Sequence, residues 1–309
     1  MLLWWVLSAW AEPTVTTRDL TGHRVAALQR ADHPSDMVVV YAAEQYGSIG
    51  PCGCNDYPMG GMARVERYAE RLAKREATSA VLKLYAGGAF LPARAAGEIR
   101  VLSGQLHPNE AMARVLERGA WDAVNITCGD LHADAPWAFP SGSLSTNLLG
   151  LDGELPRHRV IERNGISTLV LGVTGTCGDQ NQRGVRVSDP LHAVQTALAA
   201  RGEAIDRVVV LTHRVGETVS AIARLEGVDV VIEADGYTAR YPPVFASGQA
   251  VWVRTWREAE RLGELRLDWD NNGRLLRAED GAIGLAPGLR GMAWVERLVD
   301  EVATSSGPG

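Results

Sequence analysis

The stretch from Met37 to Arg67 constrains the fold of this chain more than any other. It begins with a β-branched run, Val38 to Val40, and continues into a loop that contains Pro51-Cys52-Gly53-Cys54. Gly60-Gly61 then precedes an amphipathic segment whose apolar residues recur at helical spacing. A buried strand, a glycine-rich loop and a helix in this order are typical of an open α/β sheet, which binds ligands at the carboxyl ends of its strands.

Polar and sulfur-containing side chains follow several of the predicted strands. The candidates at these strand ends are Glu44, Cys52, Cys54, Cys128, Asp130, Cys177, His213 and Asp235. The carboxyl ends of neighbouring parallel strands lie along one edge of a sheet, so we expect these side chains to share one site. All four cysteines of the chain would then lie at that edge.

Helical and alternating patterns predict the remaining elements. Helices are predicted over 61–75, 109–118, 189–200, 216–225 and 292–302. Strands are predicted over 79–85, 121–127, 144–148, 157–163, 166–173, 207–211, 228–232, 251–255, 263–268 and 274–278, the last three of them antiparallel. Asn164-Gly165 predicts a tight hairpin between two of these strands.

The composition is that of an ordinary globular protein. Of the 309 residues 46% are hydrophobic and 22% charged, and the formal net charge is −6. Because basic residues are not clustered, we expect neither nucleic acid nor an anionic membrane surface as a partner.

The first eleven residues, MLLWWVLSAWA, form an uncharged apolar run that ends in Ala9-Trp10-Ala11. This pattern is typical of a secretory signal, and the run is too short to span a bilayer. We therefore expect a signal peptide at 1–11, export to the periplasm or the extracellular space, and no transmembrane segment. A mis-assigned start or a buried N-terminal segment is the alternative, because no Lys or Arg precedes the run. We predict an N-terminal arm at 12–35, one domain at 36–303 and a disordered tail at 304–309.

The first loop resembles that of a known family. Pro51-Cys52-Gly53-Cys54, followed by Gly60-Gly61 and Arg64, is similar to an exported, selenoprotein-related branch of the calcineurin-like metallophosphoesterases of 5′-nucleotidase type. The similarity covers residues 37–285 and includes Leu211-Thr212-His213. It implies a single α/β domain with two stacked mixed β-sheets, helices on either side, and metals at the strand ends.

The metal ligands of that family are mostly replaced here. Its hydrolases use two divalent metals held by Asp, His and Asn side chains. The family motif Asp-x-His-Gly reads Glu44-Gln45-Tyr46-Gly47, and Gly-Asp reads Gly87-Gly88. Gly-Asn-His-Glu/Asp falls on Thr127 to Asp130, and Gly-His-x-His on Ala234 to Tyr237. His213 alone is unchanged, so the resemblance predicts that the two-metal site is largely lost.

Three functional hypotheses follow. The first is a metal-binding or thiol-redox site built from the cysteines and His213, with a divalent or soft ion such as Zn, Cu or Mn and no organic cofactor. The second is a metal-dependent phosphoesterase with an altered ligand set, Glu44, Asp130, His213 and Asp235. The third is a catalytically silent binding module, in which the cysteines form only structural disulfides. The partner would be an unknown small molecule or redox protein.

Overall fold

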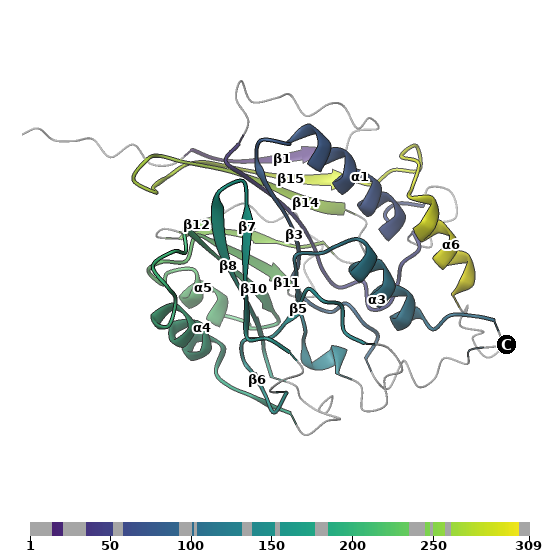
Figure 1. Cartoon of the computed structure of the whole chain (residues 1–309), viewed down its shortest axis with the longest axis horizontal. Coiled ribbons are helices and arrows are strands. Elements are labelled where there is room, and N and C mark those ends of the chain that lie inside the picture. Colours follow the sequence, from purple (N-terminus) through teal and green to yellow (C-terminus); the bar gives the residue numbers. More distant parts are fainter. Residues whose placement is uncertain are drawn as a thin grey trace, which may run out of the picture.

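The described part of the chain forms four layers, with helices on the outside and two β-sheets between them (Figure 1). The structure is a computed structural model of the full sequence. It describes residues 14–20, 35–51, 58–92, 101, 104–131, 138–151, 155–176, 185–234, 245–247, 250–256 and 261–302, with the backbone alone for 14–20 and 245–247.

The first sheet has the strand order β1-β15-β14-β2-β3-β4-β5 in the described residues. Strands β2 to β5 run parallel to one another, and β14 is antiparallel to both β2 and β15. The bounds are β1 Thr14–Leu20, β2 Met37–Ala42, β3 Ala80–Tyr85, β4 Ala123–Asn125, β5 Ser143–Leu144, β14 Arg261–Trp269 and β15 Leu275–Gly284. The carboxyl ends of β2, β3 and β4 therefore lie at one edge.

The second sheet has the order β12-β13-β11-β10-β8-β7 in the described residues. Strands β8, β10, β11 and β13 are parallel, and β7 and β12 pair antiparallel at the two edges. The bounds are β7 His158–Arg163, β8 Ile166–Thr174, β10 Arg207–His213, β11 Val230–Ala234, β12 Phe245–Ser247 and β13 Ala250–Arg254. A small antiparallel pair, β6 Leu148–Leu149 and β9 Arg186–Val187, lies apart from both sheets.

Helices cover the outer faces of the two sheets (Figure 1). On the first sheet lie α1 Met62–Arg75, α3 Pro108–Arg118 and α6 Ala293–Glu301. On the second lie α4 Pro190–Ala199 and α5 Thr218–Ile222. Pro108 and Pro190 stand at the first turns of their helices, where the missing N–H group costs nothing.

Alternation along the strands produces three apolar layers. In β2, Val38 and Val40 pack against the helices, while Val39 and Tyr41 face the second sheet. A strand places successive side chains on opposite faces, so a β-branched run buried on both sides suits a central strand. This packing fixes the strand ends, and with them the site.

The sequence patterns predicted most of these elements. Helix α1 and strands β2, β3, β8 and β10 are confirmed, as is the hairpin at Asn164-Gly165 between β7 and β8. One assignment was wrong: β13 does not join an antiparallel set with β14 and β15, but pairs parallel with β11 in the other sheet. The predicted arm at 12–35 contains β1, which pairs parallel with β15. In the described residues we find no helix long and apolar enough to cross a membrane.

Candidate functional site

Two loops after neighbouring strands form the floor of the site. The backbone N–H of Glu44 donates to Gly87 O at 2.9 Å, and that of Tyr46 donates to Gly88 O at 3.0 Å. These bonds continue the parallel pairing of β2 and β3 beyond the strands themselves. Since β10 ends at His213, the imidazole reaches the same place from the second sheet, and a side chain at Gly87 would lie 2.9 Å from His213 Cβ.

Glu44 is the central acid of this site. Its carboxylate belongs to a residue that is only 1% exposed, and Oε1 accepts a hydrogen bond from the Tyr46 hydroxyl at 2.8 Å. The Arg214 guanidinium lies close by, with Nε 3.9 Å from the same oxygen and a terminal nitrogen donating to the Tyr46 hydroxyl at 2.9 Å. Burial and the Glu44 carboxylate together raise the pKa of Tyr46 well above its ordinary value, so its hydroxyl stays protonated.

His213 faces the same carboxylate. Its Nε2 lies 3.7 Å from Glu44 Oε1 and makes no hydrogen bond to any described residue. Burial lowers the pKa of His213 to about 3, and the neighbouring Arg214 charge contributes in the same direction. The imidazole is therefore neutral at physiological pH.

Asp130 closes the site on the side of β4. It lies in the 3₁₀ turn η1 (Cys128–Asp130) and caps it, since Oδ2 accepts from both the N–H and the hydroxyl of Thr127 at 2.8 and 2.6 Å. Oδ1 accepts from the N–H of Phe90 at 2.8 Å. Burial raises the pKa of Asp130 to about 6, although these hydrogen bonds oppose the shift. Both oxygens are thus occupied in holding two loops together.

Cys128 begins the same turn and is disulfide-bonded. It is 4% exposed, so the sulfur lies beneath the surface. Of the other predicted site residues, Cys52, Cys54, Cys177 and Asp235 lie outside the described residues. The structure thus brings Glu44 and His213 into direct proximity and places Cys128 and Asp130 together in the turn after β4.

The backbone around Glu44 is unusual. Left-handed φ angles occur at Glu44 (61°), Tyr46 (47°) and Arg214 (51°), which are three of the five non-glycine residues with positive φ in the described part of the chain. Such conformations cost about 1–3 kcal/mol each and concentrate at functional sites. All three residues belong to one hydrogen-bonded group.

The described residues do not fit the two-metal centre that the family resemblance implies. In the described residues no group of three or more His, Cys, Asp and Glu side chains could hold a metal ion. Gly88 stands where the family has an aspartate, and a Cβ atom there would lie 3.0 Å from Tyr46 Cε1 and 3.3 Å from His213 Nε2. These two side chains would crowd an aspartate there, and the left-handed φ of Gly88 (66°) disfavours it further.

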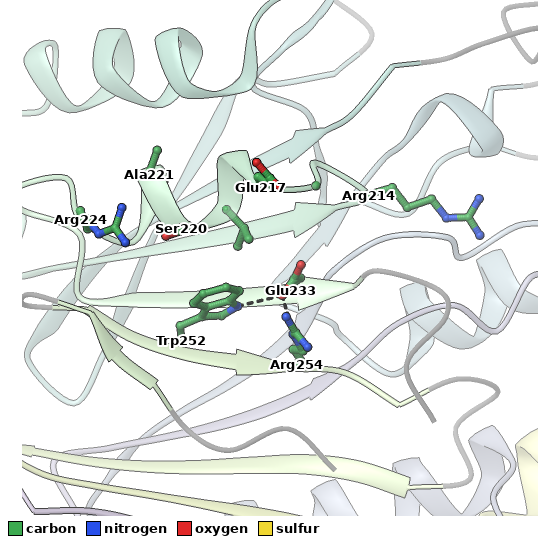
Figure 2. Close-up of a pocket in the computed structure, with 10 residues that line it drawn as sticks. Arg214, Glu217, Ser220, Ala221, Arg224, Glu233, Trp252 and Arg254 are labelled. Carbon is green, nitrogen blue, oxygen red and sulfur yellow. Dashed lines mark hydrogen bonds and ion pairs between the residues drawn. The ribbon is translucent and has the colours of Figure 1, made fainter. Parts of the chain in front are cut away.

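A cavity of about 940 Å³ opens beside the site, between α5 and the end of β13. At its wall, Glu233 accepts hydrogen bonds from Trp252 Nε1 at 2.9 Å and Arg254 Nε at 2.7 Å. Figure 2 shows Arg214 extending away from Ser220 and Trp252, so its guanidinium leaves this cavity rather than filling it. The cavity and the Glu44 site share Arg214 but no other residue named here.

Sequence reasoning missed Tyr46 and Arg214 as members of the site. Tyr46 enters the sequence prediction only as the residue that replaces a family histidine, and Arg214 is not part of that prediction. The adjacency of Arg214 to His213 was the available signal, because a residue that follows a strand-end ligand lies at the same rim.

Comparisons with solved structures support the fold. Similar chains are the 5′-nucleotidase precursor of Thermus thermophilus (19% identity, TM-score 0.64, covering 85% of this chain and 57% of that chain), sulfate thiohydrolase SoxB of the same organism (16%, 0.67, 88% and 61%) and NAD nucleotidase of Haemophilus influenzae (16%, 0.62, 85% and 55%). The chain has a metallophosphoesterase-like fold.

The chain spans 55% to 61% of the length of these three structures. No family model matches the sequence, and no curated protein matches it. At these identities the likeness establishes the fold alone.

Proposed function

We propose that this chain is an exported protein of the PCGC-carrying branch in which thiol–disulfide exchange has replaced two-metal hydrolysis. The observation that carries the proposal is the disulfide at Cys128, in the turn that follows β4 at the carboxyl edge of the first sheet. A sulfur held in a disulfide is not a thiolate ligand, so a redox role suits it better than metal binding. The apolar run at 1–11 supports export. Exported proteins meet oxidising conditions, in which disulfides form.

The exchange requires a partner dithiol. One partner thiolate attacks a sulfur of the disulfide, forms a mixed disulfide and releases the other sulfur as a thiolate. The second partner thiol then closes the partner's own disulfide, so the partner loses two electrons and this chain gains them with two protons. Because Cys128 is 4% exposed, the attack falls on the other sulfur of the bridge, and Cys128 is the leaving group.

A redox titration tests this function. The full chain is equilibrated in buffers of reduced and oxidised dithiothreitol, alkylated, and analysed by peptide mass spectrometry for the fraction of Cys128 that is reduced. We expect a midpoint above about −300 mV, since structural disulfides have lower potentials. Cys128→Ser should abolish dithiol oxidation by the chain, whereas Ser220→Ala, at the separate cavity, should leave it unchanged.

The altered-ligand phosphoesterase is a second candidate, and one observation favours it. His213 Nε2 is a buried nitrogen without a described hydrogen-bond partner, 3.7 Å from Glu44 Oε1. Turnover of 4-nitrophenyl phosphate in Mn²⁺ that is lost in His213→Ala would support it and contradict the redox proposal. A fixed disulfide with a midpoint below about −300 mV and no turnover would support a silent binding module instead.

A further inference from the structure

The negative charge of Glu44 already has a cationic neighbour within the chain. The Glu44 carboxylate is 1% exposed, and a buried carboxylate is costly unless hydrogen bonds or an opposite charge compensate it. The Arg214 Nε atom lies 3.9 Å from Glu44 Oε1, and the Tyr46 hydroxyl links the two groups, donating at 2.8 Å and accepting at 2.9 Å. Arg214, Tyr46 and Glu44 therefore form one continuous polar chain.

We propose that the Arg214 guanidinium takes over the charge-compensating role that the family resemblance assigns to a metal ion, and that it thereby keeps divalent cations away from Glu44 and His213. This inference concerns a different group of residues from the proposed disulfide chemistry and goes beyond it. It explains how the strand-end site can hold two side chains of a type that binds metals, the retained His213 and the substituted Glu44, without binding a metal.

The backbone conformations support a built arrangement rather than a chance contact. Glu44, Tyr46 and Arg214 each have positive φ, at 61°, 47° and 51°. Each conformation is unfavourable for a side chain with a Cβ atom, so the fold must hold all three residues against their own preference. Together they bring the Glu44 carboxylate, the Tyr46 hydroxyl and the Arg214 guanidinium into contact.

His213 supplies the second side chain at this site that could bind a cation. Its side chain is 8% exposed, and its Nε2 points at the Glu44 carboxylate without a described hydrogen-bond partner. A neutral imidazole nitrogen and a carboxylate oxygen 3.7 Å apart are two ligands that a divalent cation accepts. A guanidinium about 4 Å from the same oxygen repels such a cation, so it weakens cation binding at this carboxylate.

The test is the affinity for Mn²⁺ of the oxidised full chain, measured by calorimetry and by the loss of the free-ion electron paramagnetic resonance signal. Mn²⁺ is the probe because free thiolates compete poorly for it. We expect Arg214→Gln to bind one Mn²⁺ roughly tenfold or more tightly than the wild-type chain. Arg214→Lys, which keeps the charge, should resemble the wild type. Glu44→Gln added to Arg214→Gln should abolish the gain.

Two results would overturn the proposal. One is a gain in Mn²⁺ affinity that persists when Glu44→Gln is added to Arg214→Gln. The other is a folded Arg214→Gln chain, verified by circular dichroism, with no gain in affinity. Arg214→Ala repeats the test should the glutamine variant not fold. None of these readouts depends on the Cys128 disulfide, so failure here is distinguishable from failure of the redox proposal, which is judged by alkylation of cysteine.

Discussion

Glu44 and Glu66 are both buried carboxylates beside the first sheet, and the protein holds them in opposite ways. Glu66, 4% exposed, lies on regular helix α1 and accepts hydrogen bonds from Lys83 Nζ at 2.7 Å and Trp121 Nε1 at 2.8 Å. Glu44 is itself a loop residue with a left-handed backbone; it accepts a hydrogen bond from the Tyr46 hydroxyl at 2.8 Å, and Arg214 Nε lies 3.9 Å from its carboxylate.

The difference separates a structural ion pair from an adaptable site. Of the two partners of Glu66, Lys83 lies in β3 and Trp121 just before β4, and their side chains also contact one another, with Nζ 5.1 Å from the ring centroid. Around Glu44 one partner is a half-exposed arginine, and the imidazole nitrogen of His213 is left without a described partner. Short bonds from Lys83 and Trp121 hold the Glu66 carboxylate, whereas beside Glu44 the exposed arginine and the His213 nitrogen leave room for a change of partners.

The largest effect should come from breaking the structural pair. Lys83→Met leaves Glu66 buried without its cation, and we expect a loss of about 3–5 kcal/mol in the free energy of unfolding. Urea unfolding measures it, with Lys74→Met as the control, because the Lys74 side chain is 75% exposed and its loss should change little. A double variant, Lys83→Met with Glu66→Leu, should recover part of the stability. If Lys83→Met cost no more than its control, the distinction from Glu44 would be wrong.

The second-largest effect should be a loss of stability as the pH rises, caused by the titration of Asp130. Burial raises its pKa from the ordinary value of 3.8 to about 6, a difference worth about 3 kcal/mol. The folded-state pKa is the higher one, so this contribution is fully present below pH 3.8 and is lost as the pH rises through 6. Asp130→Asn, which does not titrate, should lack this decline. Urea unfolding of both chains between pH 4 and 7 measures the difference, and parallel curves would contradict the shift.

The fold was predictable because its signals are local. The β-branched run of β2, the helical spacing of α1 and the glycines at 60 and 61 can each be recognised within a few consecutive residues. Strand β13 was assigned to the wrong set because alternation along a single strand does not indicate which strand it pairs with. Its pairing with β11 depends on tertiary packing.

The candidate site was predictable in part. Glu44 and His213 were predicted to lie near one another because each follows a predicted strand, and their side chains are 3.7 Å apart; their role stays a prediction. Tyr46 and Arg214 were missed because their hydrogen bond joins residues 168 positions apart. Their left-handed backbone also depends on tertiary contacts, since neither residue type favours positive φ.

The smallest effect should come from the link between Arg214 and Glu44. Tyr46→Phe removes a hydroxyl that donates to Glu44 at 2.8 Å and accepts from Arg214 at 2.9 Å. We expect a loss of about 1 kcal/mol in unfolding free energy, because Arg214 is half-exposed and retains water as a partner. Tyr41→Phe is the matched control: its hydroxyl donates at 2.7 Å to Asp280, which is 3% exposed, so it should cost more. Equal losses in urea unfolding would mean that the Glu44 group is held as rigidly as the structural core, and the contrast with Glu66 would fail.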